Sequence, residues 1–476
     1  MLRNTVLKHL NIKIRSYYMT KVNERDRKSA AHYAEHQIIR DLLGGTKSMR
    51  LAGEKYLPRE PAEEAFYYEN PENKVKKLVD PYKNRLKRAV LFNAVKRATQ
   101  NYLGKLFKKT VVIETENKKK EIQAFLKSID GADALPQHIL SKAARDVIEK
   151  GCGGFMCDAE QDRNNSGYIY WVSPENVLGG KFRGKELVNL RLLEIHEEDV
   201  EDSYDTELVE VVREFKKGAD GKVSWTLHKK ADGKFVRVQD WVDLNIDVIP
   251  YVPVLASGHI AGELFDDSPL LALAEVNVSH WIKSSSLENI IHIAQHPILK
   301  VTGLSDSPKN PTIKVGVGNA VALPKGADLS YEEPSCNGVE KAQEEIEKTK
   351  QLMEVLGLEL VTTKQNETAT GRALDADVAN SSLTSIANTL SAGFEKAFKI
   401  VGNYYYEPEL VVSVKISKDF GITASQVELD NLTKARLNED ISHDYYMKEL
   451  KRRGVVDESL DLEQNKLELQ AEKETL

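Results

Sequence analysis

Five Gly-Lys pairs are the first residues to test for phosphate chemistry, because a nucleotide-binding loop ends in Gly-Lys-Ser or Gly-Lys-Thr. The pairs begin at Gly104, Gly180, Gly184, Gly221 and Gly233. None is followed by Ser or Thr. The sequence also lacks His-Glu-x-x-His and Gly-x-Ser-x-Gly, which mark zinc peptidases and serine hydrolases. We therefore expect no enzyme activity and no cofactor.

Histidines and cysteines give little reason to expect a metal. His32 and His36 are four residues apart, as are His292 and His296, so each pair could share one helix face. A zinc site needs a third protein ligand, and neither pair has one nearby. The chain has three cysteines, Cys152, Cys157 and Cys336. They form no Cys-x-x-Cys pair, so we expect reduced packing residues and no metal site.

The composition is that of an ordinary soluble globular protein. Of 476 residues, 41% are hydrophobic and 29% are charged, and the formal net charge is -6. Neither disorder nor a fibrous repeat is predicted. No apolar run approaches the roughly 18 residues of a membrane span. We expect a soluble protein made in a cytoplasm, with about three structural units at roughly 150 residues each.

The strongest basic block covers residues 73–110, where Asp80 is the only acidic residue. One interpretation is a phosphate-binding patch. The other, which we favour, is a single amphipathic helix over residues 83–108, because apolar residues recur there at four-residue steps. These residues are Leu86, Val90, Ala94, Ala98, Tyr102 and Leu106.

The elements that would position any functional residue change in character along the chain. Residues 25–150 are predicted to be mostly helical, with prolines in the loops. From residue 151, β-rich runs and Asp-Gly turns at Asp220 and Asp232 predict an antiparallel meander of about three strands. In its middle strand, apolar Val223 and Trp225 alternate with polar residues, which predicts one buried and one solvent-facing side.

The second half has an unusual order of elements. A long helix is predicted from Ser268 to about residue 296, then a non-helical segment to residue 334 that is punctuated by Gly and Pro. A helix over 337–356, a polar stretch and a very long helix over about 372–401 follow. One side of this last helix carries a row predicted to be buried: Leu374, Val378, Ser382, Ile386, Leu390, Phe394 and Phe398. A strand-like run and charged helices complete the chain.

Several stretches in this order resemble the portal proteins of tailed double-stranded DNA bacteriophages. They are RLAGEKYLPRE (50–60), RLKRAVLFNAVKRATQNYLGKLFKK (85–109), GCGGFMCD (151–158), PYVPVLASG (250–258), SPLLALAEVNVSHWIKSSSLENIIHIAQHPILKVTG (268–303), VALPKGADLSYEEPS (321–335) and ETATGRALDADVANSSLTSIANTLSAGFEKAF (367–398). Together they sample most of residues 50–400, whereas the two ends of the chain match only loosely.

The resemblance implies an α+β, mainly helical portal-type fold with a wing, stem, clip, tunnel loop and crown, including the β meander. The implied boundaries are 1–257 for the wing, 258–296 for the first stem helix, 297–334 for the clip, 335–357 for the second stem helix, 358–371 for the tunnel loop, 372–423 for the long wing helix and strand, and 424–476 for the crown.

The resemblance also implies a function and partners. Portal proteins form a ring, normally of twelve subunits, at one capsid vertex of the virion. Through the ring, double-stranded DNA is packaged and ejected without sequence specificity. The implied partners are the terminase large subunit, a head-tail adaptor, and the major capsid and scaffolding proteins. Assembly in the host cytoplasm is implied, and no membrane is involved.

Site residues follow from these assignments. The DNA-facing tunnel loop would present Thr362, Thr363, Lys364, Gln365 and Asn366, and the channel-lining stem would present Glu340, Glu344, Glu347 and Lys348. Such a nearly neutral or acidic lining avoids capturing DNA by its phosphates. Clip docking would use Lys300, Lys309 and Lys314, and the subunit interface would use Trp281 and Ile282.

Simpler interpretations stay open beside these. Residues 358–371 could be a solvated connector, and Trp281 could be buried within its own subunit. Two other functions also compete: a nucleic-acid-processing enzyme that uses the basic block, and another head-tail connector or scaffolding protein of a phage particle. The enzyme lacks a phosphate or metal motif, and the other structural proteins would not need this order of helices.

Overall fold

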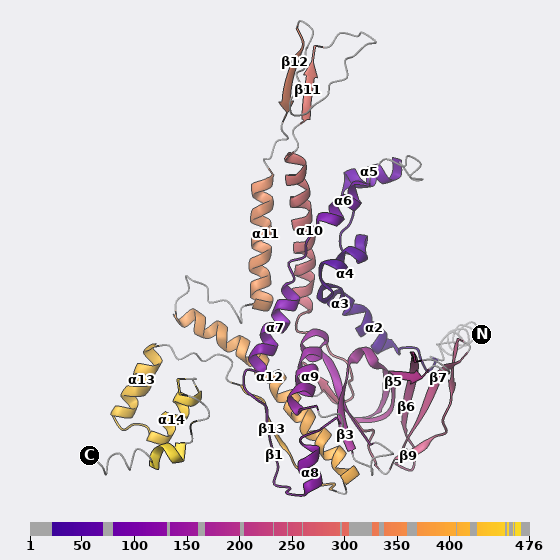
Figure 1. Cartoon of the computed structure of the whole chain (residues 1–476), viewed down its shortest axis with the longest axis vertical. Helices are drawn as coiled ribbons and strands as arrows, with labels where there is room; N and C mark the ends of the chain where they lie inside the picture. Colours follow the sequence, from indigo (N-terminus) through magenta and orange to yellow (C-terminus); the bar gives the residue numbers. More distant parts are fainter. Residues whose placement is uncertain are drawn as a thin grey trace, which may run out of the picture.

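The computed structural model describes residues 21–69, 80–130, 134–159, 167–199, 204–231, 233–244, 246–258, 260–295, 298–303, 326–332, 338–358, 369–405, 407–418, 426–452, 455–456, 460 and 462–467. It has a mixed helix and sheet architecture in which every described strand pair is antiparallel. A body of helices and antiparallel sheets carries a two-helix stalk. Short C-terminal helices lie beside the body (Figure 1).

The N-terminal third is mostly helical, as the sequence predicts. Its helices are α2 (Arg27–Glu35), α3 (Gln37–Leu43), α4 (Gly45–Ala52), α5 (Pro61–Glu69), α6 (Pro81–Arg88), α7 (Ala94–Leu106), α8 (Lys120–Phe125) and α9 (Pro136–Lys150), with a 3-10 turn at Gly53–Lys55. Strand β1 (Val112–Glu114) pairs with β13 (Ser413–Lys415) near the C-terminal end of the body.

The single helix predicted over residues 83–108 is wrong, because the chain leaves helical geometry between α6 and α7. Asn93 starts α7 by accepting the N–H of Lys96, and the side chain of Asn277 accepts the N–H of Ala94 at 3.0 Å. These polar contacts replace helical hydrogen bonds at the break. Val90, placed by the periodicity on the buried row, is 63% exposed.

The body contains two larger sheets. One has strand order β10-β2-β3, with β2 (Cys152–Ala159) between β3 (Gly167–Val172) and β10 (Tyr251–Leu255). The other joins β4 (Val177–Arg183), β5 (Glu186–Asp199), β6 (Thr206–Lys217), β7 (Val223–Ala231), β8 (Lys234–Arg237) and β9 (Val242–Leu244). The predicted meander corresponds to β6-β7-β8 and is confirmed, within a wider sheet.

The side of β7 that was predicted to face solvent is only partly exposed. Thr226 is fully buried and its hydroxyl donates to the carbonyl of Gln239. The chain that follows β8 returns to the edge of β7 as β9, and Gln239, which precedes β9, lies against Thr226. Alternation in one strand could not reveal a covering segment that comes later in the chain.

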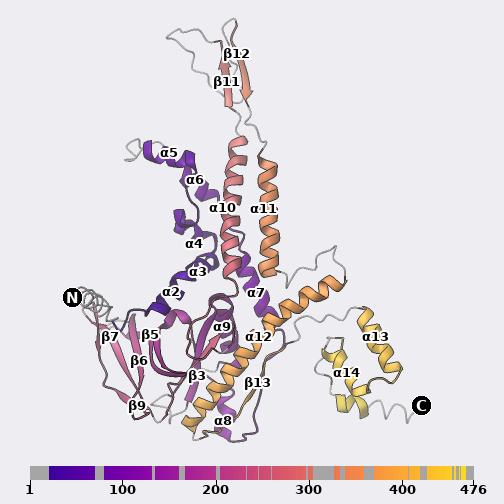
Figure 2. The ribbon, with the colours of Figure 1, turned by 180° about the vertical axis from the view of Figure 1, so that it is seen from behind.

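The long helix α12 (Ala369–Gly402) crosses the body and packs on β2 and β10 (Figure 2). Four members of its predicted row are buried: Ile386, Leu390, Phe394 and Phe398. Ser382 is exposed instead, and its neighbour Leu383 is buried. Leu374 and Val378 lie outside the described side chains. The larger hydrophobic core therefore joins α12 to the three-stranded sheet and to α7 and α9.

The stalk consists of α10 (Leu271–Ala294) and α11 (Val339–Met353), which lie side by side, with one π-helical turn at Glu354–Leu358 (Figure 1). Ser268 precedes α10 and its hydroxyl accepts the N–H of Leu270. Strands β11 (Ile298–Thr302) and β12 (Asp328–Glu332) form an antiparallel hairpin beyond the stalk. The described parts of residues 298–334 are thus strands rather than helix, as predicted.

The C-terminal helices are α13 (Gln426–Leu437) and α14 (His443–Arg452), which contact each other. They lie to one side of the body in Figure 2. No helix in the described part of the chain combines the length and the apolar character needed to cross a membrane.

Two glycines predict opposite effects on stability. In α7, a methyl group at the exposed Gly104 would meet no atom within 4 Å, so Gly104→Ala should raise the free energy of unfolding by about 0.5–1 kcal/mol through helix propensity. In β2, a methyl group at Gly154 would overlap the ring of Tyr251. Gly154→Ala should therefore lower the free energy of unfolding. Denaturant unfolding measures both; a stabilised Gly154→Ala would contradict the described packing.

Candidate functional site

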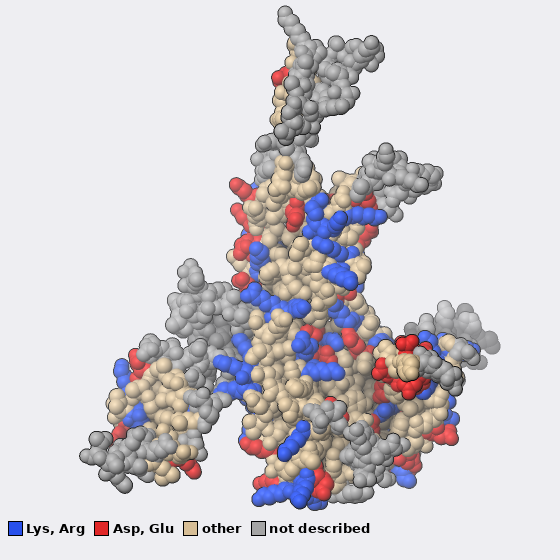
Figure 3. Space-filling model, in the orientation of Figure 1, with Lys and Arg blue, Asp and Glu red and all other residues tan. Residues whose placement is uncertain are grey.

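The stalk brings the predicted channel-lining residues onto one exposed helix face. Ile346, Thr349 and Met353 of α11 are buried, and Lys283 of α10 donates to the hydroxyl of Thr349 at 3.0 Å. Their three- and four-residue spacing is that of a coiled-coil seam. The predicted residues lie on the other side and are exposed: Glu340, Glu344, Glu347 and Lys348. Figure 3 shows acidic side chains gathered along this edge of the stalk.

The contacts of these side chains within the chain are few and exposed. Lys348 lies 2.9 Å from the carboxylate of Glu345, and Lys350 lies 3.5 Å from that of Glu347. The hydrogen bond from Lys348 holds the pKa of Glu345 below its ordinary value. Exposed pairs of this kind contribute little to stability, so these charges are available to something outside the chain.

The two residues predicted for the subunit interface differ in exposure. Trp281 is fully buried in the chain's own core, and its indole N–H has no hydrogen-bond partner among the described residues. Its side chain therefore cannot touch a second subunit in this conformation. This is the simpler of the two interpretations left open by the sequence. Ile282 is half-buried and packs against the same core.

The predicted docking and tunnel residues are described only in part. Lys300 lies on β11, where it forms an ion pair of 2.7 Å with Glu332 across the hairpin. Lys309 and Lys314 lie outside the described residues, as does every predicted tunnel-loop residue: Thr362, Thr363, Lys364, Gln365 and Asn366.

The basic block divides into buried and exposed positions. Arg85 is 1% exposed, and its guanidinium meets the carboxylate of Glu63 at 2.8 and 2.7 Å. Its role is to hold α6 against α5. Other basic side chains are exposed on α6, α7 and the residues after α7: Lys83, Lys87, Lys96, Arg97 and Lys108. Figure 3 shows basic side chains over this part of the surface.

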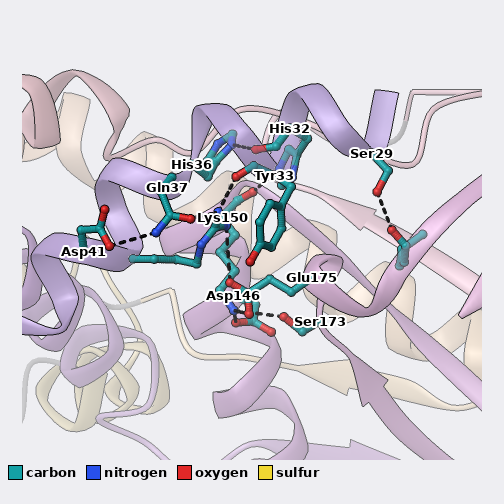
Figure 4. Close-up of polar contacts among 12 residues, drawn as sticks. Ser29, His32, Tyr33, His36, Gln37, Asp41, Asp146, Lys150, Ser173 and Glu175 are labelled. Atoms are coloured by element: carbon teal, nitrogen blue, oxygen red, sulfur yellow. Dashed lines mark hydrogen bonds and ion pairs between the residues drawn. The ribbon is translucent and has the colours of Figure 1, made fainter. Parts of the chain in front are cut away.

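A buried polar network joins α2 and α3 to α9 and to Ser173 and Glu175, which follow β3 (Figure 4). Lys150 lies 2.9 Å from Asp146 and 3.1 Å from Glu175, and donates to the hydroxyl of Ser173. Burial opposes the charge of Lys150, but attraction to Asp146 and Glu175 outweighs it and raises the lysine pKa. Trp171 donates to Asp146 at 2.8 Å. Sequence reasoning missed this network, since its members are far apart in the chain.

The two histidines predicted to face one side of a helix stack in this network at a ring distance of 4.1 Å. His32 Nε2 lies 2.8 Å from the carbonyl of Lys150, so it donates. His36 donates from Nδ1 to the carbonyl of His32 and accepts the N–H of Ser268 at Nε2. All of these ring nitrogens are occupied by backbone groups. Within the described residues, no group of three or more His, Cys, Asp or Glu could hold a metal ion.

The contact between His32 and Cys152, 3.4 Å from Nε2 to Sγ, is unsuited to nucleophilic chemistry. Burial raises the pKa of the Cys152 thiol to about 12, and burial with repulsion from His36 lowers the pKa of His32 to about 4. A neutral thiol beside a neutral imidazole is not the ion pair that activates a cysteine. Cys152 and Cys157 are both free and buried, as predicted.

The lowered pKa of His32 leads us to expect a loss of stability in mild acid. Its pKa of about 4 in the folded chain is below the ordinary value of 6.5, so the unfolded chain binds more protons between these values. The free energy of unfolding should therefore fall as the pH drops from 6.5 to 4, by about 3 kcal/mol for this residue. Denaturant unfolding at several pH values measures the slope. The variant His32→Gln should show a smaller slope; an unchanged slope would contradict the assignment.

Comparisons with known proteins give limited matches. A family model described as "Domain of unknown function (DUF4055)" matches residues 269–405, which is less than half of the chain. No curated protein matches. Matched solved structures include the neck of a native GTA particle computed with C12 symmetry (12% identity, 75% of this chain and 89% of that chain, TM-score 0.40).

Two further matches are similar in extent. The neck of an empty GTA particle computed with C6 symmetry has 11% identity over 83% of this chain and 94% of that chain, with a TM-score of 0.40. The virion of a native gene transfer agent (GTA) particle has 12% identity over 79% and 89%, with a TM-score of 0.37. TM-scores below 0.5 do not establish a shared fold.

Proposed function

We propose that this chain is the portal subunit of a phage-like particle, of which about twelve copies form a ring at one capsid vertex. The observation that supports this most is the stalk: α10 and α11 pack side by side and antiparallel, project from the body of helices and antiparallel sheets, and end in the β11–β12 hairpin. The order of helix, hairpin, helix and very long helix is the one that the sequence resemblance implies.

In this proposal the exposed face of α11 lines the conduit. Its acidic residues Glu340, Glu344 and Glu347 outnumber the nearby Lys348. DNA is held by neutralising its phosphates, and each such contact slows its movement. A lining with a slight excess of carboxylates gives passing DNA little to bind, and Lys364 of the proposed tunnel loop adds one weak, screened contact per subunit.

The hairpin at the end of the stalk is the proposed docking surface. Lys300, with Lys309 and Lys314 of the same segment, would meet the terminase large subunit during packaging and a head-tail adaptor afterwards. The body would contact the major capsid and scaffolding proteins during assembly in the host cytoplasm. The chain itself would be structural and not catalytic, which agrees with the inactive protonation states of Cys152 and His32.

A charge reversal on α11 tests this function. Glu344 lies in the middle of the exposed face, so Glu344→Lys would place a ring of added cations in the conduit. We expect rings of unchanged mass but less DNA packaged per particle, with partial recovery at higher salt, because added phosphate contacts are salt-sensitive. The matched control is Glu275→Lys at an exposed position of α10. Equal packaging by Glu344→Lys and the unmodified chain would remove α11 from the conduit.

A further inference from the structure

The exposed face of α11 carries two charged columns. Its buried residues repeat with a period of seven, and Glu340 and Glu347 are also seven residues apart, so they share one side of the helix. Lys341 and Lys348 share the next side by the same spacing. Glu344 lies between the two sets. We call Glu340 and Glu347 the Glu column and Lys341 and Lys348 the Lys column.

One member of each column has no ion-pair partner in the described part of its own chain, and the other has only an exposed pair. Glu340 and Lys341 have no ion-pair partner within the described residues, and Lys348 and Glu347 have only the exposed pairs with Glu345 and Lys350. All four side chains of the columns are exposed. A column of one charge beside a column of the other makes a surface that is complementary to a shifted copy of itself.

Rotation about the axis of a ring keeps every residue at its height along that axis. Glu340 and Lys341 differ in height by only about 1.5 Å on a helix parallel to the axis, as do Glu347 and Lys348. We infer that the Glu column of one copy pairs with the Lys column of the next copy, giving two ladders of ion pairs around the stem. This inference rests on the ring proposed above.

Apolar groups on the stalk support a second copy as the occupant. Leu352 of α11 and Val355 of the π-helical turn after it are 48% and 45% exposed. A groove of about 420 Å³ beside Lys350 of α11 is lined mostly by α10, including Leu287 and Ile291. A neighbouring stalk would cover Leu352, Val355 and this groove.

Paired reversals test the ladder on the full chain. The first variant, Glu340→Lys with Glu347→Lys, makes both columns positive; the second, Lys341→Glu with Lys348→Glu, makes both negative. Each alone should need at least about a tenfold higher subunit concentration for half-assembly, because like charges then face each other. A 1:1 mixture should assemble again, since the two variants can alternate around a ring. Native mass spectrometry with one variant tagged measures the composition.

A third variant combines all four substitutions and exchanges the columns. This variant should assemble as well as the unmodified chain. Raised salt should reduce the differences among the variants in the subunit concentration needed for half-assembly. Circular dichroism checks that each variant is folded. If the single-column variants assemble normally, or if neither the mixture nor the exchange restores rings, the ladder is wrong. If the unmodified chain forms no ring at all, the proposed function fails first, and the two failures are thus distinguished.

Discussion

Leu390→Asp is expected to leave the chain unable to fold into its described body. Leu390 is fully buried on the side of α12 that faces the three-stranded sheet, between Ile386 and Phe394. An unpaired carboxylate in that apolar site costs more free energy than a typical domain has in reserve. We expect insoluble protein, or a soluble chain without a cooperative unfolding transition, as measured by circular dichroism during heating.

Ala392→Asp is the matched control, because it adds the same charge to the same helix at an exposed position. Its free energy of unfolding should change by about 0.5 kcal/mol or less. If Leu390→Asp folds with a similar stability to Ala392→Asp, then the buried side of α12 has been misassigned, and with it the packing of α12 on the three-stranded sheet.

Glu63→Ala is expected to have the second largest effect. The carboxylate of Glu63 pairs through two hydrogen bonds with the guanidinium of Arg85, and both side chains are almost fully buried. Removing the acid leaves a buried cation with no charge partner of that quality, which costs about 3–5 kcal/mol. Urea unfolding of the variant should show this loss.

A double variant separates the interaction between Glu63 and Arg85 from the effect of changing each residue alone. Glu63→Leu with Arg85→Met replaces both charges by apolar groups, and such replacements of buried pairs are often neutral. We expect the double variant to be more stable than Glu63→Ala and more stable than Arg85→Met alone. Additive losses from the two sites would mean that Glu63 and Arg85 stabilise the helices independently.

Short-range sequence patterns predicted the elements that depend on neighbouring residues. Asp-Gly turns predicted the β6-β7-β8 meander. The four-residue spacing in α12 predicted the burial of Ile386, Leu390, Phe394 and Phe398. The predicted stem residues of α11 came from the resemblance and from the charge of this helix, and the structure shows that Glu340, Glu344, Glu347 and Lys348 are exposed. In each case the neighbours that decide the structure lie within one helix or one hairpin.

The features that sequence missed depend on residues distant in the chain. The break between α6 and α7 is held by Asn277, which comes almost two hundred residues later. Thr226 is buried because the chain after β8 covers it. In the network around Lys150, His32 bonds to the carbonyl of Lys150 and His36 to the N–H of Ser268, and such backbone groups carry no sequence signal. Burial of Trp281 depends in the same way on tertiary packing.

The mass of the purified full-length chain in native solution tests the central claim most directly. The ring account predicts one closed species of about twelve times the 53.5 kDa subunit mass at micromolar concentration and physiological salt. A monodisperse 53.5 kDa species under those conditions, or an unlimited series of open oligomers, would contradict it.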